Sequence, residues 1–85
     1  MKNGSFQEIM VKNETPEMFP ATYGIYDRAE RKIGVLRWYS RAEQYSFFPL
    51  GGTALSWITM FEIMYFTNKA MDEYARHLML SLIHI

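Results

Sequence analysis

Two histidines and one isolated glutamate are the residues whose positions could support metal binding or acid–base chemistry. His77 and His84 stand seven residues apart, so they could share one side of a helix. A zinc site needs three or four ligands, and the chain contains no cysteine that could complete one. Glu62 interrupts an apolar stretch, but paired-carboxylate chemistry needs a second acid held across a cleft, and none is indicated. The sequence therefore predicts ordinary helix histidines, a Glu62 at the solvent edge of a helix, and no catalytic, cofactor-binding or metal-binding residue.

Basic and aromatic side chains alternate in one segment, as they do on surfaces that bind nucleic acid. Arg37 and Tyr39 fall on one side of a predicted strand, where rings can stack on bases and guanidinium groups can contact phosphate. However, Lys+Arg and Asp+Glu number nine each, so the net charge is zero. Nucleic-acid binding, whose affinity comes largely from phosphate contacts, is therefore the alternative hypothesis. It would use Arg37, Tyr39 and the basic loop residues Arg28, Arg31, Lys32 and Arg41.

Length and composition favour a single small domain, residues 1–85. Apolar residues make up 49% and charged residues 21% of the chain, which is typical of a folded protein. The absence of cysteine excludes a disulfide-stabilised scaffold. The longest apolar stretch, residues 54–67, is shorter than the roughly 20 residues that span a bilayer. Since the first residues show no targeting signal, we expect a cytoplasmic protein with no membrane partner and no small-molecule substrate.

Three segments rich in strand-forming residues follow one another and are separated by polar turns. They are residues 22–27, 33–39 and 44–48, and they predict a three-stranded antiparallel meander. Residues 6–12 form a possible extra N-terminal strand. Between these elements, Thr15 and Pro16 favour one helical turn that would carry Met18 and Phe19 into the core.

The alternation of side chains defines the register of the second hairpin. A four-residue loop pairs Tyr39 with Gln44, and one face of the hairpin is then wholly apolar or aromatic. The predicted core face consists of Leu36, Trp38, Tyr45 and Phe47, with Tyr23 and Ile25 added if the first hairpin pairs favourably. The opposite face mixes apolar and polar residues, and its candidate contact residues are Tyr26, Val35, Arg37, Tyr39 and Phe48.

From Trp57 onward, polar residues recur at helical spacing and predict one long amphipathic helix. Its residues Met60, Ile63 and Met64 are predicted to cover the core face of the sheet. A helix over residues 57–80 would be about 36 Å long at 1.5 Å per residue. A domain of this size is only about 30 Å across. The helix should therefore overhang the sheet, break near Thr67, or pack against another chain.

The hairpin carries a string by which the chain resembles a known family. Residues 33–40 read IGVLRWYS and residues 44–49 read QYSFFP. They are similar to the G-x-I-x-W-Y…Q-Y-x-F-F-P hairpin of small uncharacterised proteins encoded by phages, prophages and related bacterial mobile elements. The family's helix matches here at Thr53, Met60, Glu62, Ile63 and Phe66.

This resemblance implies a bacterial host cell and an α+β fold, and it implies no particular activity. The chain departs from the family at the hairpin tip, where Ala42 and Glu43 replace a usual Trp-Arg pair. That departure argues against a binding role for the tip. Residues 80–85 also resemble translated sequencing-adapter sequence, which would make them a foreign tail; the alternative is a genuine apolar helix end.

The sequence as a whole predicts an α+β fold, a meander packed by one C-terminal helix. The leading functional hypothesis is a non-enzymatic accessory protein of a phage or mobile element. It would act as a protein–protein interaction module, with either another protein or a second copy of itself as partner.

Overall fold

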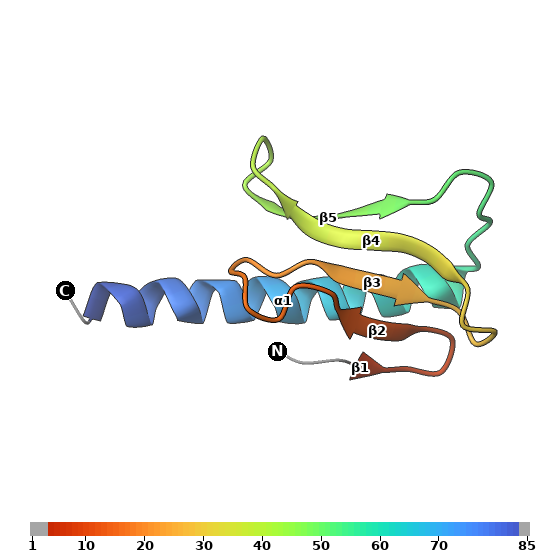
Figure 1. Ribbon diagram of the computed structural model, residues 1–85, viewed down its shortest axis with the longest axis horizontal. Coiled ribbons are helices and arrows are strands. Elements are labelled where there is room, and N and C mark those ends of the chain that lie inside the picture. The colour runs from red at the N-terminus through yellow and green to blue at the C-terminus, as the bar shows by residue number, and fades with distance from the viewer. Residues whose placement is uncertain (1–3, 84–85) are drawn as a thin grey trace.

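The computed structural model describes residues 4–83 and shows an antiparallel sheet against which one long helix packs (Figure 1). The five strands lie in the sheet in chain order, so each pairs with the next. This confirms the predicted α+β fold, and the meander is extended on its N-terminal side. The strands are β1 (Gly4–Ser5), β2 (Met10–Asn13), β3 (Tyr23–Tyr26), β4 (Lys32–Tyr39) and β5 (Gln44–Pro49).

The β4–β5 hairpin has the predicted register, with Tyr39 opposite Gln44 and Trp38 opposite Tyr45. Glu43 ends the turn with a positive φ of 54°. In the same hairpin, Gly34 lies against the ring of Phe47, and a Cβ at position 34 would collide with that ring. Glycine is therefore needed here because the neighbouring strand places an aromatic side chain over the backbone.

The β3–β4 hairpin has the register that puts Tyr23 and Ile25 on the core face, since Tyr23 lies opposite Leu36. The charged loop between the strands is followed by an irregularity in the pairing. Ile25 pairs with Gly34, whereas Tyr26 pairs with Lys32, so Ile33 is an extra residue in β4. Ile33 is buried, because a bulge shifts the side-chain alternation of its strand.

Helix α1 (Trp57–Ile83) runs for 27 residues without a break. Ser56 is its N-cap, since the Ser56 hydroxyl accepts a hydrogen bond from the Thr59 backbone N–H at 3.2 Å. At 1.5 Å per residue the helix is about 40 Å long. Its C-terminal turns extend beyond the strands, which gives the molecule a long dimension of 45 Å (Figure 1). Of the three predicted outcomes for the helix, overhang is the one observed within this chain.

The core lies between the sheet and the side of α1 that faces it. Its most completely buried side chains come from four elements or their flanks: Phe66, Ile9, Ile25, Leu36 and Val11. Among the predicted core residues, Leu36, Tyr45 and Ile63 are buried. Trp38 and Phe47 are partly buried and pack against the edge of this cluster.

Met60 and Met64 are exposed, so their placement in the predicted core is wrong. Phe66 and Ala70, with Ile63, occupy the buried side of α1 instead. The first turns of α1 are apolar on nearly every side, and the predicted orientation took Glu62 as the mark of the solvent side. Glu62 is buried, which rotates the helix relative to that expectation.

The carboxylate of Glu62 receives three backbone hydrogen bonds from the loop before β2. Its Oε2 accepts from Gln7 at 3.1 Å, and its Oε1 accepts from Glu8 at 2.9 Å and Ile9 at 3.1 Å. Burial of a carboxylate is tolerated where hydrogen bonds replace its water shell. The expected solvent-edge position of Glu62 is therefore wrong because residues distant in the chain supply its donors.

The segment between β2 and β3 contains one hydrogen-bonded turn, in which the Met18 N–H donates to the Thr15 carbonyl oxygen at 2.9 Å, followed by bends and no helix. The Thr15 hydroxyl accepts a hydrogen bond from the Thr22 N–H at 2.8 Å, which closes this segment into a loop. Met18 and Phe19 are exposed, so neither enters the core as predicted. Phe19 instead lies against the outer turns of α1, where its ring stacks on Tyr74.

Candidate interaction surfaces

The outer face of the sheet holds the predicted contact residues in two separate groups. Tyr39 and Phe48 meet edge to face with ring centroids 5.7 Å apart. The guanidinium carbon of Arg37 lies 4.0 Å from the centre of the Phe48 ring, a cation–π contact. Val35 lies opposite Phe48 in the β4–β5 ladder. Arg37 is exposed and the other three are partly buried, so this group presents two rings that already pack on each other.

The second group surrounds Tyr26, whose hydroxyl donates a hydrogen bond to Glu14 at 2.9 Å. The ammonium of Lys32 donates to both oxygens of Glu14, at 2.8 and 3.0 Å, and holds the pKa of that carboxyl below its ordinary value. Lys12 lies over the Tyr26 ring at 4.8 Å. Gly24 leaves room for the carboxylate, because a Cβ there would approach Glu14 Oε2 to 2.5 Å. One of the two lysines is thus neutralised locally, which weakens this face as a phosphate-binding surface.

Residues 4–13 do not lie over the outer face, because their strands β1 and β2 extend the sheet at its edge. Ile9 and Val11 point to the core side of the sheet and are buried there. In the described part of the chain, α1 is the only helix, and it covers that same core side (Figure 1). The five predicted contact residues therefore lie on an open face, divided between the Phe48 and Tyr26 groups.

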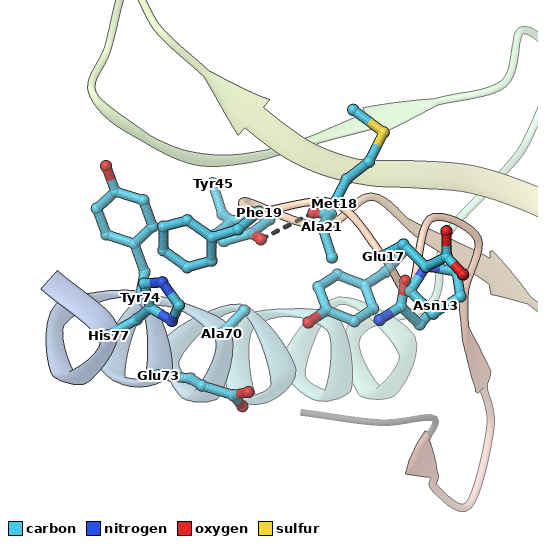
Figure 2. Close-up of a pocket in the computed structure, with 12 residues that line it drawn as sticks. Asn13, Glu17, Met18, Phe19, Ala21, Tyr45, Ala70, Glu73, Tyr74 and His77 are labelled. Carbon is cyan, nitrogen blue, oxygen red and sulfur yellow. Dashed lines mark hydrogen bonds between the residues drawn. The ribbon is translucent and has the colours of Figure 1, made fainter. Parts of the chain in front are cut away.

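A cleft of about 280 Å³ lies between the β2–β3 loop and α1 (Figure 2). Beside this cleft, four rings stack in succession from the sheet outward: Trp38, Tyr74, Phe19 and His77. The distances between successive ring centroids are 4.1, 5.1 and 3.8 Å. His77 therefore has a packing role. His84, the second histidine considered for a metal site, lies outside the described residues.

The floor of this cleft contains the hydroxyl of Tyr45, which donates a hydrogen bond to the Ala21 carbonyl oxygen at 2.8 Å (Figure 2). Burial raises the pKa of Tyr45 far above its ordinary value, and burial also raises the pKa of Tyr23. Both tyrosines are therefore neutral structural groups at neutral pH. Across residues 4–83, no cluster of three or more His, Cys, Asp or Glu side chains could hold a metal ion.

An exposed apolar area lies on α1, on the side turned away from the sheet. We call it the α1 apolar surface; it consists of Trp57, Met60, Phe61, Met64 and Tyr65, whose exposed fractions are 73%, 51%, 56%, 55% and 47%. Beside it runs a groove of about 440 Å³, whose wall includes Phe6. The Phe6 ring meets Tyr65 edge to face at 6.0 Å.

Sequence reasoning missed this surface because it assigned Met60 and Met64 to the core. The available signal was the apolar character of the whole stretch around Glu62, which exceeds what one buried side of a helix requires. Comparison of the chain with protein-family models, with curated proteins and with solved structures found no match. Within residues 4–83, no helix has both the length and the apolar character needed to cross a membrane.

Proposed function

We propose that this chain is a non-enzymatic protein–protein interaction module that binds its partner through the α1 apolar surface. The observation that carries the proposal is the exposure of five neighbouring large side chains, Trp57, Met60, Phe61, Met64 and Tyr65. Contiguous apolar area of this kind usually marks a contact site, and aromatic residues and methionine are enriched in such contacts.

The opposite side of α1 is held firmly, which supports the proposal. Phe66 is buried against Tyr23, with ring centroids 5.0 Å apart, and Glu62 binds three backbone N–H groups. The exposed side chains therefore project from a fixed helix. A surface that is ordered before binding loses less conformational entropy when the partner docks.

The biological setting in this proposal rests on the resemblance of residues 33–49 to the phage and mobile-element hairpin. Under this proposal the chain is an accessory protein that acts in the cytoplasm of a bacterial host. It requires no cofactor, since contact through apolar side chains is its whole activity.

Site-specific crosslinking in the bacterial host tests the proposal. A photoreactive phenylalanine analogue is placed at Phe61, and the matched control carries it at Arg41, which is exposed on the β4–β5 turn. We expect protein adducts at position 61 that are absent at position 41. Equal adducts at both positions, or none at position 61, would overturn the proposal.

Affinity purification without crosslinking, of the unmodified chain and of Arg37→Ala, tests the nucleic-acid alternative. If nucleic acid is recovered instead of protein, is released by added salt, and is lost in Arg37→Ala, the contact is made to phosphate. That outcome would replace the α1 apolar surface by the Arg37 and Tyr39 face as the functional site.

A further inference from the structure

The exposed side of α1 has a second regularity beyond its apolar character. Starting at Trp57, side chains at steps of four, three and four residues are Phe61, Met64 and Asn68. Alternating steps of four and three give the 3.5-residue period of a coiled-coil seam. The helix therefore presents, on its free side, the spacing with which α-helices pack along one another.

The period continues through the second half of the helix. The next positions at the same spacing are Met71, Ala75, Leu78 and Leu82. Ala75, Leu78 and Leu82 are exposed, and Met71 is partly buried beside β5, where its sulfur accepts a hydrogen bond from the Tyr45 N–H at 3.2 Å. We call these eight positions, from Trp57 to Leu82, the α1 seam.

We propose that the α1 seam binds a second copy of the same chain, with the two α1 helices antiparallel. This proposal rests on the proposed function and names its partner. A two-fold dimer needs a surface that is complementary to itself. The seam meets this requirement, because an axis between Asn68 and Met71 places every seam position opposite another seam position.

Side-chain size favours the antiparallel arrangement. In it, Phe61 opposes Leu78 and Met64 opposes Ala75, so each layer combines a larger side chain with a smaller one. A parallel pair would set Trp57 against Trp57 at one end and Ala75 against Ala75 further along. Uniform layers pack better because the two helix axes can keep a constant separation.

Polar groups and charge are compatible with this pairing. Asn68 is the only polar seam residue, and it lies next to the two-fold axis, so the Asn68 side chains of the two copies fall in adjacent layers. Beside the seam, Tyr65 of one copy opposes Asp72 of the other, so a hydroxyl faces a carboxylate. Arg76 already neutralises this carboxylate within its own chain, with Arg76 Nη2 2.9 Å from Asp72 Oδ2. The chain has zero net charge, so two copies do not repel each other.

The available area is also sufficient. The exposed parts of the large seam side chains and of Met60 and Tyr65 come to about 800 Å² if a whole large side chain presents roughly 200 Å². One partner in a specific complex of standard size contributes about 800 Å². Pairing along α1 would therefore cover a conventional interface without any rearrangement of the fold.

Sedimentation equilibrium of the purified full chain, from micromolar to millimolar concentration, tests the proposal. We expect a monomer–dimer equilibrium whose dissociation constant rises at least about 100-fold in Phe61→Gln/Met64→Gln, as for residues that dominate an interface. The matched control is Tyr39→Ser/Phe48→Ser on the outer sheet face, which should leave the constant unchanged. Circular dichroism verifies that both variants are folded, since Phe61 and Met64 are exposed and Tyr39 and Phe48 are only partly buried.

Disulfide trapping tests the orientation, because the chain has no cysteine of its own. A mixture of Phe61→Cys and Leu78→Cys should form a mixed disulfide, while either variant alone should not. Rapid crosslinking of Phe61→Cys with itself would overturn the antiparallel arrangement, since a disulfide requires Cα atoms within about 7 Å.

A chain that stays monomeric at every concentration would overturn this inference. The proposed function would survive that result if crosslinks from position 61 reach a different protein. A dimer that the sheet-face variant abolishes and the seam variant spares would assign self-association to the outer sheet face instead.

Discussion

Glu62 and Ile9 are joined by a hydrogen bond across 53 residues of sequence, from the Ile9 backbone N–H to Glu62 Oε1 at 3.1 Å. Ile9 is itself completely buried against the core. One buried carboxylate therefore attaches the N-terminal loop to α1, and with it the start of β2. The helix orientation that exposes the α1 seam depends on this attachment.

The first prediction is that Glu62→Ala lowers the free energy of unfolding by about 3 kcal/mol. The substitution leaves the backbone N–H groups of Gln7, Glu8 and Ile9 without their acceptor, and each buried unsatisfied group costs about 1–3 kcal/mol. Water can reach Gln7, which limits the total. Urea denaturation followed by circular dichroism measures the change.

Glu62→Gln is the matched control for this prediction. Its remaining amide oxygen can still accept from Glu8 and Ile9, while its NH₂ group faces the Gln7 N–H. We expect a loss smaller than that of Glu62→Ala. Equal stability of all three proteins would show that the carboxylate does not hold the N-terminal loop.

The sheet was predictable from sequence because alternation and turn length act locally. Leu36, Trp38 and Tyr45 occupy alternating positions in their strands, and a four-residue turn allows only one pairing that gathers them on one wholly apolar or aromatic face. The order of β3, β4 and β5 and the register of β4–β5 follow directly. The bulge at Ile33 did not, because no residue type in the charged loop specifies it.

The helix orientation was not predictable in the same way. Residues 57–66 are apolar on nearly all sides, so the apolar pattern of that half alone allows more than one side to be buried. The deciding group is Glu62, and its partners are backbone N–H groups from residues 7–9. A contact so distant in the chain leaves no periodic signal, which is why the exposed side of α1 was missed.

The second prediction concerns alkaline pH. Burial raises the pKa of Tyr45 in the folded state, whereas the unfolded chain ionises near the ordinary value of 10.0. Above pH 10 the unfolded state therefore releases a proton that the folded state keeps, so stability is full below this pH and falls as pH rises further. Urea midpoints measured at several pH values between neutral and strongly alkaline should show this decline.

Tyr45→Phe separates this ionisation from general alkaline effects. The variant should lose about 1 kcal/mol at neutral pH, because the hydrogen bond to the Ala21 carbonyl is removed. Its stability should then fall less steeply with pH than that of the unmodified chain, with a remaining slope from Tyr23 and Tyr26, whose pKa values are also raised. A slope identical to the parent's would contradict the assignment.

The third prediction contrasts the two tryptophans. The rings of Trp38 and Tyr74 stack with centroids 4.1 Å apart, so Trp38→Ala should lower the free energy of unfolding by about 3 kcal/mol. This value is at the low end of the losses seen when a large aromatic side chain is truncated, because the Trp38 ring is partly exposed. Trp57 is highly exposed, and Trp57→Ala should leave the stability of the monomer within about 0.5 kcal/mol. Urea denaturation at low protein concentration measures both.

Fluorescence quenching by acrylamide gives an independent check with Trp38→Phe and Trp57→Phe. The variant that retains Trp57 should be quenched strongly at low concentration and less as concentration rises, because Trp57 lies in the α1 seam. The variant that retains Trp38 should be quenched weakly throughout. Strong quenching of Trp38 would contradict the stacking of its ring on Tyr74 of α1.

The fourth prediction is that removing residues 80–85 changes the thermal midpoint of the monomer by less than about 4 °C, the shift that 1 kcal/mol produces in a small domain. The C-terminal turns of α1 extend beyond the sheet (Figure 1). Leu80 and Leu82 are exposed, so their removal uncovers little core. Circular dichroism at low protein concentration measures the midpoint. Phe66→Ala provides the contrast, because it truncates a fully buried ring and should lower the free energy of unfolding by about 3–5 kcal/mol. A loss of stability as large as that of Phe66→Ala would show that the last turn of α1 packs on the domain. A small shift of the thermal midpoint would show that Leu82 does not stabilise the monomer and contributes only to the end of the α1 seam.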